Sequence, residues 1–81
     1  MKVFVTDKHI KNGKRGECGS CPIALALIDA GFRNVQVTGS QAIVDGRRWE
    51  IPDGIFEIIA EFDEHGNMEP FEFEFPLEVA A

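Results

Sequence analysis

Residues 21–31 read CPIALALIDAG, and this stretch decides how the rest of the chain must fold. Pro22 stands where a helix begins and Gly31 where it ends, because proline fits the first helical position and glycine fits the residue just past the last one. Between them almost every position is apolar, so the helix has no polar side to give to solvent. The stretch therefore predicts a helix that is buried against a sheet or against another chain.

Alternating segments on either side of this helix predict the strands that cover it. Residues 2–6 and 34–38 alternate between apolar and polar positions and are rich in β-branched residues. Asp45-Gly46 joins residues 42–44 to residues 47–51, and this dipeptide between two strand-like runs is a strong hairpin signal. We therefore expect one strand before the buried helix and three directly after it.

The last strand is predicted at residues 71–75, which read FEFEF. Strict alternation places three phenylalanines on the core face and two glutamates on the solvent face. Pro70 and Pro76 bracket the segment, and because proline cannot donate to a strand ladder, they indicate an edge strand.

The remaining segments predict one more helix and a loop. Residues 54–64 carry apolar positions on one helical face, with Asp53 as the capping residue and Gly66 as the stop. Residues 7–19 are polar and glycine-containing, and we expect a loop there. The element order β-α-β-β-β-α-β predicts a single α+β domain over residues 1–81, in which a mostly antiparallel sheet packs against two helices.

Charge is divided unevenly along the chain, whose 81 residues carry a net charge of −6. Residues 1–49 hold all eight Lys and Arg against four acids, a formal charge of +4. Residues 50–81 hold ten acids and no base, a formal charge of −10. The second half is therefore unsuited to bind a phosphate backbone directly, and a basic protein surface is the partner that it would attract.

The acids of this second half are the first candidate binding residues. Glu57, Glu61 and Glu64 share one side of the second helix, and like charges at that spacing destabilise a helix by about 0.2–0.5 kcal/mol per pair. A solvated surface is the competing interpretation, but such a surface usually interleaves lysine, and none is present here. The predicted partner-binding residues are Glu57, Glu61, Asp63, Glu64, Glu69, Glu72, Glu74 and Glu78.

Arg47, Arg48 and Trp49 form a secondary contact candidate, because tryptophan and arginine are enriched in binding hot spots. Trp49 is the single tryptophan of the chain. The interpretation that we favour for Trp49 is packing in the core.

Both cysteines lie in one C-x-x-C motif just ahead of the buried helix. Cys18, Cys21 and His9 could hold a zinc ion, with His65, Asp7 or water as the fourth ligand. Alternatively, the motif fits a thiol–disulfide oxidoreductase, because a helix N-terminus lowers the pKa of a thiol. The interpretation that we favour is structural, with Cys21 capping the helix and Cys18 filling a local gap.

The chain contains the pattern His9-x8-Cys18-x2-Cys21-Pro22-Ile23-Ala24-Leu25-Ala26-Leu27, followed by Phe62-Asp63 and Glu69-Pro70-Phe71-Glu72-Phe73. This pattern resembles small uncharacterised proteins encoded by bacteriophages and prophages, over most of the chain. The resemblance implies a phage setting, in which small acidic proteins often inhibit host defence, as anti-CRISPR and anti-restriction proteins do. Several of those proteins imitate DNA. The resemblance carries over no catalytic residue.

Taken together, these features predict a non-enzymatic inhibitor of the host-defence type, with no catalytic residue and no cofactor unless zinc is bound. Its acidic face would meet the basic, nucleic-acid-binding surface of a host protein complex, in the cytoplasm of the host bacterial cell. We expect no direct contact with nucleic acid, and none with a membrane, because no run approaches the roughly 18 apolar residues of a span. A homodimer through the apolar helix is an alternative use of that surface.

Overall fold

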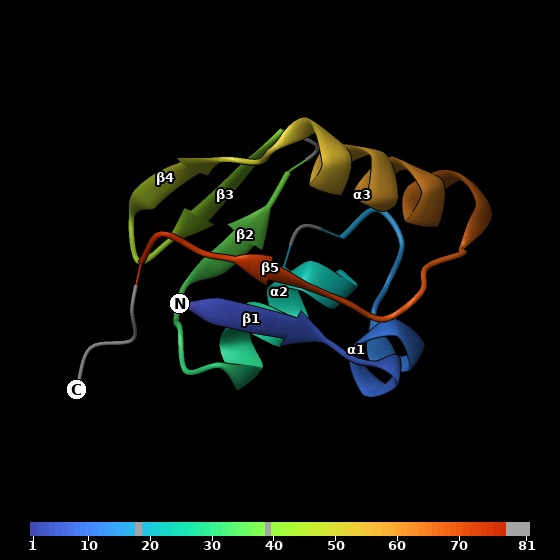
Figure 1. Cartoon of the computed structure of the whole chain (residues 1–81), viewed down its shortest axis with the longest axis horizontal. Helices are drawn as coiled ribbons and strands as arrows, with labels where there is room; N and C mark the ends of the chain where they lie inside the picture. The colour runs from blue at the N-terminus through green and yellow to red at the C-terminus, as the bar shows by residue number, and fades with distance from the viewer. Residues whose placement is uncertain (18, 39, 78–81) are drawn as a thin grey trace.

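The computed structural model describes residues 1–17, 19–38 and 40–77. These residues form five strands and three helices, and the strands make two antiparallel sheets (Figure 1). The elements, in chain order, are β1 (Lys2–Val5), α1 (Asp7–Asn12), α2 (Pro22–Asp29), β2 (Val35–Val37), β3 (Gln41–Val44), β4 (Arg47–Glu50), α3 (Asp53–His65) and β5 (Phe71–Glu74). The predicted α+β class is confirmed.

The sequence predicted a single sheet, but the strands form two. β2, β3 and β4 form a three-stranded meander, whereas β1 pairs with β5 in a separate two-stranded sheet. The two sheets meet through side chains, because the Trp49 ring of β4 stacks on Phe73 of β5 at 5.7 Å and meets Phe75 edge-on at 4.9 Å. Aromatic packing thus holds together two sheets that backbone pairing leaves separate.

The expectation of a loop over residues 7–19 is wrong in its first half, where α1 covers Asp7–Asn12. Thr6 precedes this helix, and its backbone N–H donates to Nδ1 of His9 at 3.0 Å. This is the bond that a capping box makes, but the box normally carries Glu or Gln where this chain has histidine. The sequence signal for the helix start was therefore hidden by an unusual residue.

α2 is the buried helix predicted from the opening stretch. It packs against β1, β2 and α1, and its residues Ile23, Ala24, Ala26 and Leu27 are at most 2% exposed. Sγ of Cys21 accepts a hydrogen bond from the Ala24 N–H at 3.4 Å, which confirms the capping interpretation of Cys21. Because most of its apolar side chains are used inside the chain, α2 offers little of the surface that a homodimer was expected to use.

α3 begins and ends close to the predicted positions. Gly66 follows it in the left-handed conformation, at φ 74°, as a terminating glycine does. The expected capping role of Asp53 is wrong, because Pro52 is the capping residue and Asp53 is the first residue of the helix. At that position its negative charge still interacts favourably with the positive end of the helix dipole. The chain then returns from α3 to β5, which lies beside β1 (Figure 1).

Candidate functional site

The predicted acidic residues of α3 lie on two different sides of the helix. Glu57, Glu61 and Glu64 are exposed and form one stripe. Asp63 lies about a third of a turn away from that stripe. Its Oδ1 accepts a hydrogen bond from the Gly16 N–H at 3.2 Å. Asp63 therefore helps to hold the loop that contains Gly16 against α3, and we do not count Asp63 with the binding surface.

The acids of β5 face solvent as predicted, while Phe73 and Phe75 are buried beneath them. The Glu72 carboxylate lies 3.8 Å from Nζ of Lys2, and the Glu74 carboxylate lies 3.6 Å from the amino-terminal nitrogen. On α3, Glu64 lies 3.7 Å from Nε2 of its neighbour His65. Glu72 and Glu74 thus each have a cationic neighbour inside the chain, whereas the neighbour of Glu64 is cationic only when His65 is protonated. Exposed pairs of this kind contribute only about 0–1 kcal/mol to stability.

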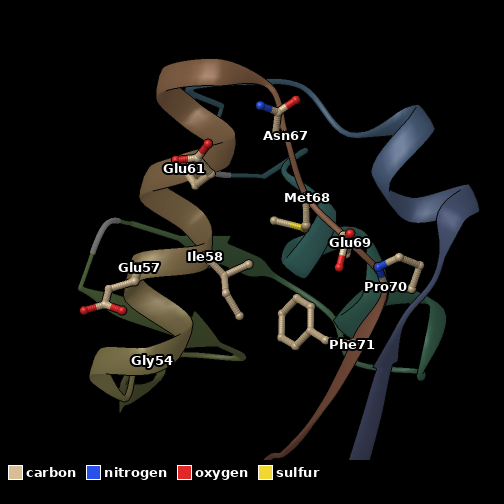
Figure 2. A pocket seen from close by; sticks show the side chains of 9 residues that line it. All are labelled: Gly54, Glu57, Ile58, Glu61, Asn67, Met68, Glu69, Pro70 and Phe71. Atoms are coloured by element: carbon tan, nitrogen blue, oxygen red, sulfur yellow. The ribbon is translucent and has the colours of Figure 1, made fainter.

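Apart from Asp63, three of the predicted acids that the structure describes have no such neighbour. Across the part of the chain that the structure describes, no basic nitrogen lies within 4.0 Å of the carboxylates of Glu57, Glu61 or Glu69. All three line one open cavity of about 480 Å³, between α3 and the segment that leads into β5 (Figure 2). We call it the α3 cavity. These three unneutralised acids therefore lie around a single concave surface.

The floor of the α3 cavity is apolar. Figure 2 shows the side chains of Ile58, Met68 and Phe71 pointing toward one another, whereas Glu57 points away from them. All three apolar side chains are half-buried, so each keeps some surface open to solvent. The α3 cavity thus combines an apolar floor with carboxylates at its edge.

A second cavity, of about 400 Å³, adjoins the first, and we call it the β1 cavity. It shares Pro70 and Phe71 with the α3 cavity, and its other lining residues are Phe4, Val5, Thr6, Asp7 and Glu72. Phe4 is 57% exposed, which is high for a phenylalanine. The two cavities thus have two lining residues in common, Pro70 and Phe71.

Sequence reasoning found the acids of this surface but missed its apolar members. Phe71 was assigned wholly to the core, and neither Met68 nor Phe4 was singled out. The alternation of β1 does place Phe4 on the side opposite the buried Val3 and Val5, and that was an available signal. Met68 lies outside any helix or strand, so no periodic pattern could reveal it.

The secondary contact candidate does not form a patch with the acids. Trp49 is half-buried and packs against the core, as we favoured from the sequence. Arg47 and Arg48 are exposed on β4, on opposite faces of the strand. Glu78 lies outside the described residues.

His9 is buried, and both of its ring nitrogens already have partners. Nδ1 accepts from the Thr6 N–H at 3.0 Å, so the ring hydrogen sits on Nε2 and donates to Oδ2 of Asp29 at 2.9 Å. The hydrogen bond from His9 lowers the pKa of Asp29. His9 thereby ties the start of α1 to the end of α2.

Asp29, His9 and Thr6 follow one another in the order of an acid–base–hydroxyl triad. Oγ1 of Thr6 lies 3.1 Å from Nδ1 of His9. However, Nδ1 already accepts the Thr6 backbone N–H, which helps to hold the start of α1. Using the same lone pair as a general base would compete with that bond. We therefore assign this trio to structure.

The zinc hypothesis would require His9 to give up one of its two hydrogen bonds. Among residues 1–17, 19–38 and 40–77, no group of three or more His, Cys, Asp or Glu is arranged to hold a metal ion. Cys18 lies outside the described residues, so the zinc and dithiol hypotheses, which both need it, stay predictions.

Among the residues that the structure describes, none of the helices is long and apolar enough to cross a membrane. Comparisons with protein-family models, with curated proteins and with solved structures find no match for this chain. Fold and surface geometry are therefore the basis for the function proposed next.

Proposed function

We propose that this chain is a non-enzymatic interaction module that binds a basic protein surface through its acidic second half. One observation carries the proposal: Glu57, Glu61 and Glu69 have no basic neighbour within the described chain, and all three line one open cavity. Carboxylates that remain unneutralised around a concave surface raise the local concentration of cations and steer a basic partner toward it.

The charge division along the chain supports the same proposal. Lys and Arg are confined to residues 1–49, so the segment that forms α3 and β5 has no base of its own. Repulsion between neighbouring glutamates of α3 is relieved when a cationic surface approaches them. Binding should therefore be strong at low ionic strength and weaken as salt screens the charges beyond about 8–10 Å.

The resemblance to phage and prophage proteins supports a narrower form of this proposal. In that form the partner is a host-defence complex whose basic groove binds nucleic acid, and the acidic surface occupies the groove in place of a phosphate backbone. The setting would then be the cytoplasm of the host bacterial cell. Duplex DNA should compete with the chain for such a partner, because both would use the same cations.

The test compares two double variants that change the net charge equally. In the first, Glu57→Gln and Glu61→Gln remove two carboxylates of the α3 cavity. In the control, Glu17→Gln and Glu50→Gln remove two exposed carboxylates that do not line it. Basic host proteins retained by the immobilised wild-type chain are eluted with a salt gradient or with duplex DNA.

We expect the first variant to release these proteins at lower salt, and the control to elute like the wild type. Equal elution of both variants would show that net charge alone governs retention, and would contradict a localised binding surface. Retention that duplex DNA does not reduce would contradict the narrower form only.

A further inference from the structure

The α3 cavity and the β1 cavity share Pro70 and Phe71 as lining residues, and both are lined in part by apolar side chains. Ile58 and Met68 line the first, Phe4 lines the second, and Phe71 lines both. Charge attraction alone does not require such a floor, because carboxylates on a flat polar surface would attract a basic partner equally well. The apolar floor therefore carries information about the partner beyond its charge.

The chemistry of the floor selects the kind of side chain that fits it. Isoleucine and phenylalanine offer no hydrogen-bonding groups, and methionine offers only a weak acceptor. A polar side chain entering this surface would therefore lose hydrogen bonds to water without replacement, whereas an apolar side chain has none to lose. Methionine adapts its shape to irregular neighbours, which suits a surface that receives a flexible segment. The surrounding carboxylates then favour Lys or Arg next to that apolar side chain.

Two other occupants fit the surface poorly. A phosphate backbone would bring negative charge against Glu57, Glu61 and Glu69, where no basic nitrogen lies within 4.0 Å in the described chain. A second copy of this chain carries a net charge of −6, and its residues 50–81 contain no Lys or Arg. It would therefore bring like charge to the surface unless its residues 1–49 made the contact. A basic partner of different sequence is the better match.

Building on the proposed function, we infer that the partner contributes a linear segment in which apolar side chains alternate with Lys or Arg. The apolar side chains occupy the α3 cavity and the β1 cavity, which have Pro70 and Phe71 in common. The cationic side chains meet the carboxylates of Glu57, Glu61 and Glu69, and that of Glu72 at the second cavity. Apolar anchors with charged neighbours are a recurring way in which proteins recognise peptide segments.

Two synthetic peptides of equal charge test this inference. One has four lysines alternating with four leucines, and the other has four lysines alternating with four serines. Their affinities for the full chain are measured at low salt, and amide resonances of the chain are followed by NMR during each titration. Burial of even one leucine on the apolar floor should make the leucine peptide bind about tenfold more tightly or better.

We expect the leucine peptide to shift the resonances of Ile58, Met68, Phe71 and Phe4. Phe4→Ala should reduce the advantage of the leucine peptide over the serine peptide, because it removes part of the floor. Phe56→Ala is the matched control, since Phe56 is also exposed, at 42%, but lines neither cavity. Neither change should alter the affinity of the serine peptide.

The possible failures are distinguishable. Equal affinity of the two peptides, or leucine-dependent shifts at other residues, would overturn this inference and leave the proposed function standing. Failure of both peptides to bind at low salt would overturn the proposed function itself, and this inference with it.

Discussion

Gly66 stops α3 in a backbone conformation that other residues rarely adopt. Its φ is 74°, and a Cβ built there would lie 3.7 Å from Cδ of Arg15, which is ordinary van der Waals contact. Space is therefore available, and the cost of Gly66→Ala is conformational, about 1 kcal/mol of unfolding free energy.

Gly54, within the first turn of the same helix, provides the opposite control. Its φ is not positive and a Cβ there would meet nothing within 4 Å, so Gly54→Ala should stabilise the chain by about 0.5–1 kcal/mol. Urea denaturation of the two variants measures both changes. The same sign of change in both would contradict the assignment of Gly66 as a stop that requires glycine.

Asp29 makes the stability of the fold depend on pH in a predictable direction. The hydrogen bond from His9 lowers the Asp29 pKa from its ordinary value of 3.8. A carboxylate of this kind adds stability that is fully present above its unfolded pKa and is lost as pH falls through its lower folded pKa. Asp29→Asn should therefore lower the urea midpoint at neutral pH, and the two midpoints should converge below pH 3.8.

The convergence should depend on the partner ring. In a His9→Ala background, Asp29→Asn should change the midpoint much less, because the interaction is already gone. An undiminished effect in that background would show that Asp29 acts through another contact.

At the scale of elements, Arg15 connects the loop after α1 to the far end of α3. Its Nε and Nη2 donate to the Asp63 carbonyl at 3.1 and 3.0 Å, and Nη2 donates to the Glu64 carbonyl at 2.6 Å. The last carbonyls of a helix otherwise lack hydrogen-bond donors within the helix. A cation at this end also interacts favourably with the negative end of the helix dipole. This contact joins residues that are 48 positions apart in the chain.

Arg15→Ala should therefore lower the unfolding free energy by about 0.5–1 kcal/mol, a modest value because the contact is exposed. Amide hydrogen exchange should become faster in the last turn of α3, while the first turn should change little. Arg15→Lys keeps the charge but loses the two-pronged donor, so it should restore only part of the protection. Full protection with lysine would show that the charge alone stabilises this helix end.

The sequence predicts correctly the elements whose apolar residues follow a regular pattern. It does not predict an element whose start depends on a single side-chain contact. α2 was predictable because Pro22, the apolar run and Gly31 agree with one another. α1 was not, because its start depends on a histidine that replaces the usual Glu or Gln of a capping box. The division into two sheets was hidden as well, because alternation shows that a segment is a strand but not which strand it pairs with.

At the scale of the whole molecule, the two sheets depend on one aromatic group. Phe75 is 1% exposed, its ring meets Trp49 at 4.9 Å and Phe32 at 5.0 Å, and it links the region after β5 to the meander. Phe75→Ala should cost about 3–5 kcal/mol. That is a large share of the roughly 4–12 kcal/mol expected for a domain of this length.

Phe4→Ala makes the same chemical change on the surface and should cost about 0.5 kcal/mol or less. Urea denaturation followed by circular dichroism measures both variants, and the emission of Trp49 reports separately on whether the sheets remain packed. A Phe75→Ala chain that unfolds at the wild-type midpoint would contradict the linking role of Phe75.

The acids of the candidate binding surface could be predicted from the sequence, but their ion pairs and the cavities could not. Charge is a property of composition, so the acids of residues 50–81 could be read directly from the sequence. Which of them have a basic neighbour depends on the tertiary fold, as the pairing of Glu72 with Lys2 illustrates, because these residues lie at opposite ends of the chain. The cavities depend in the same way on where the segment before β5 passes α3.

The pairing of β1 with β5 has a consequence for how the chain is made. At synthesis rates of about 5–20 residues per second, roughly 4–14 s separate the emergence of the first strand from that of the last. During this interval β1 has no strand partner, and the hydrophobic core to which α2 belongs still lacks Phe73 and Phe75. β5 is the last in chain order of the five strands that the structure describes, so the hydrophobic core closes only after Phe73 and Phe75 have been synthesised.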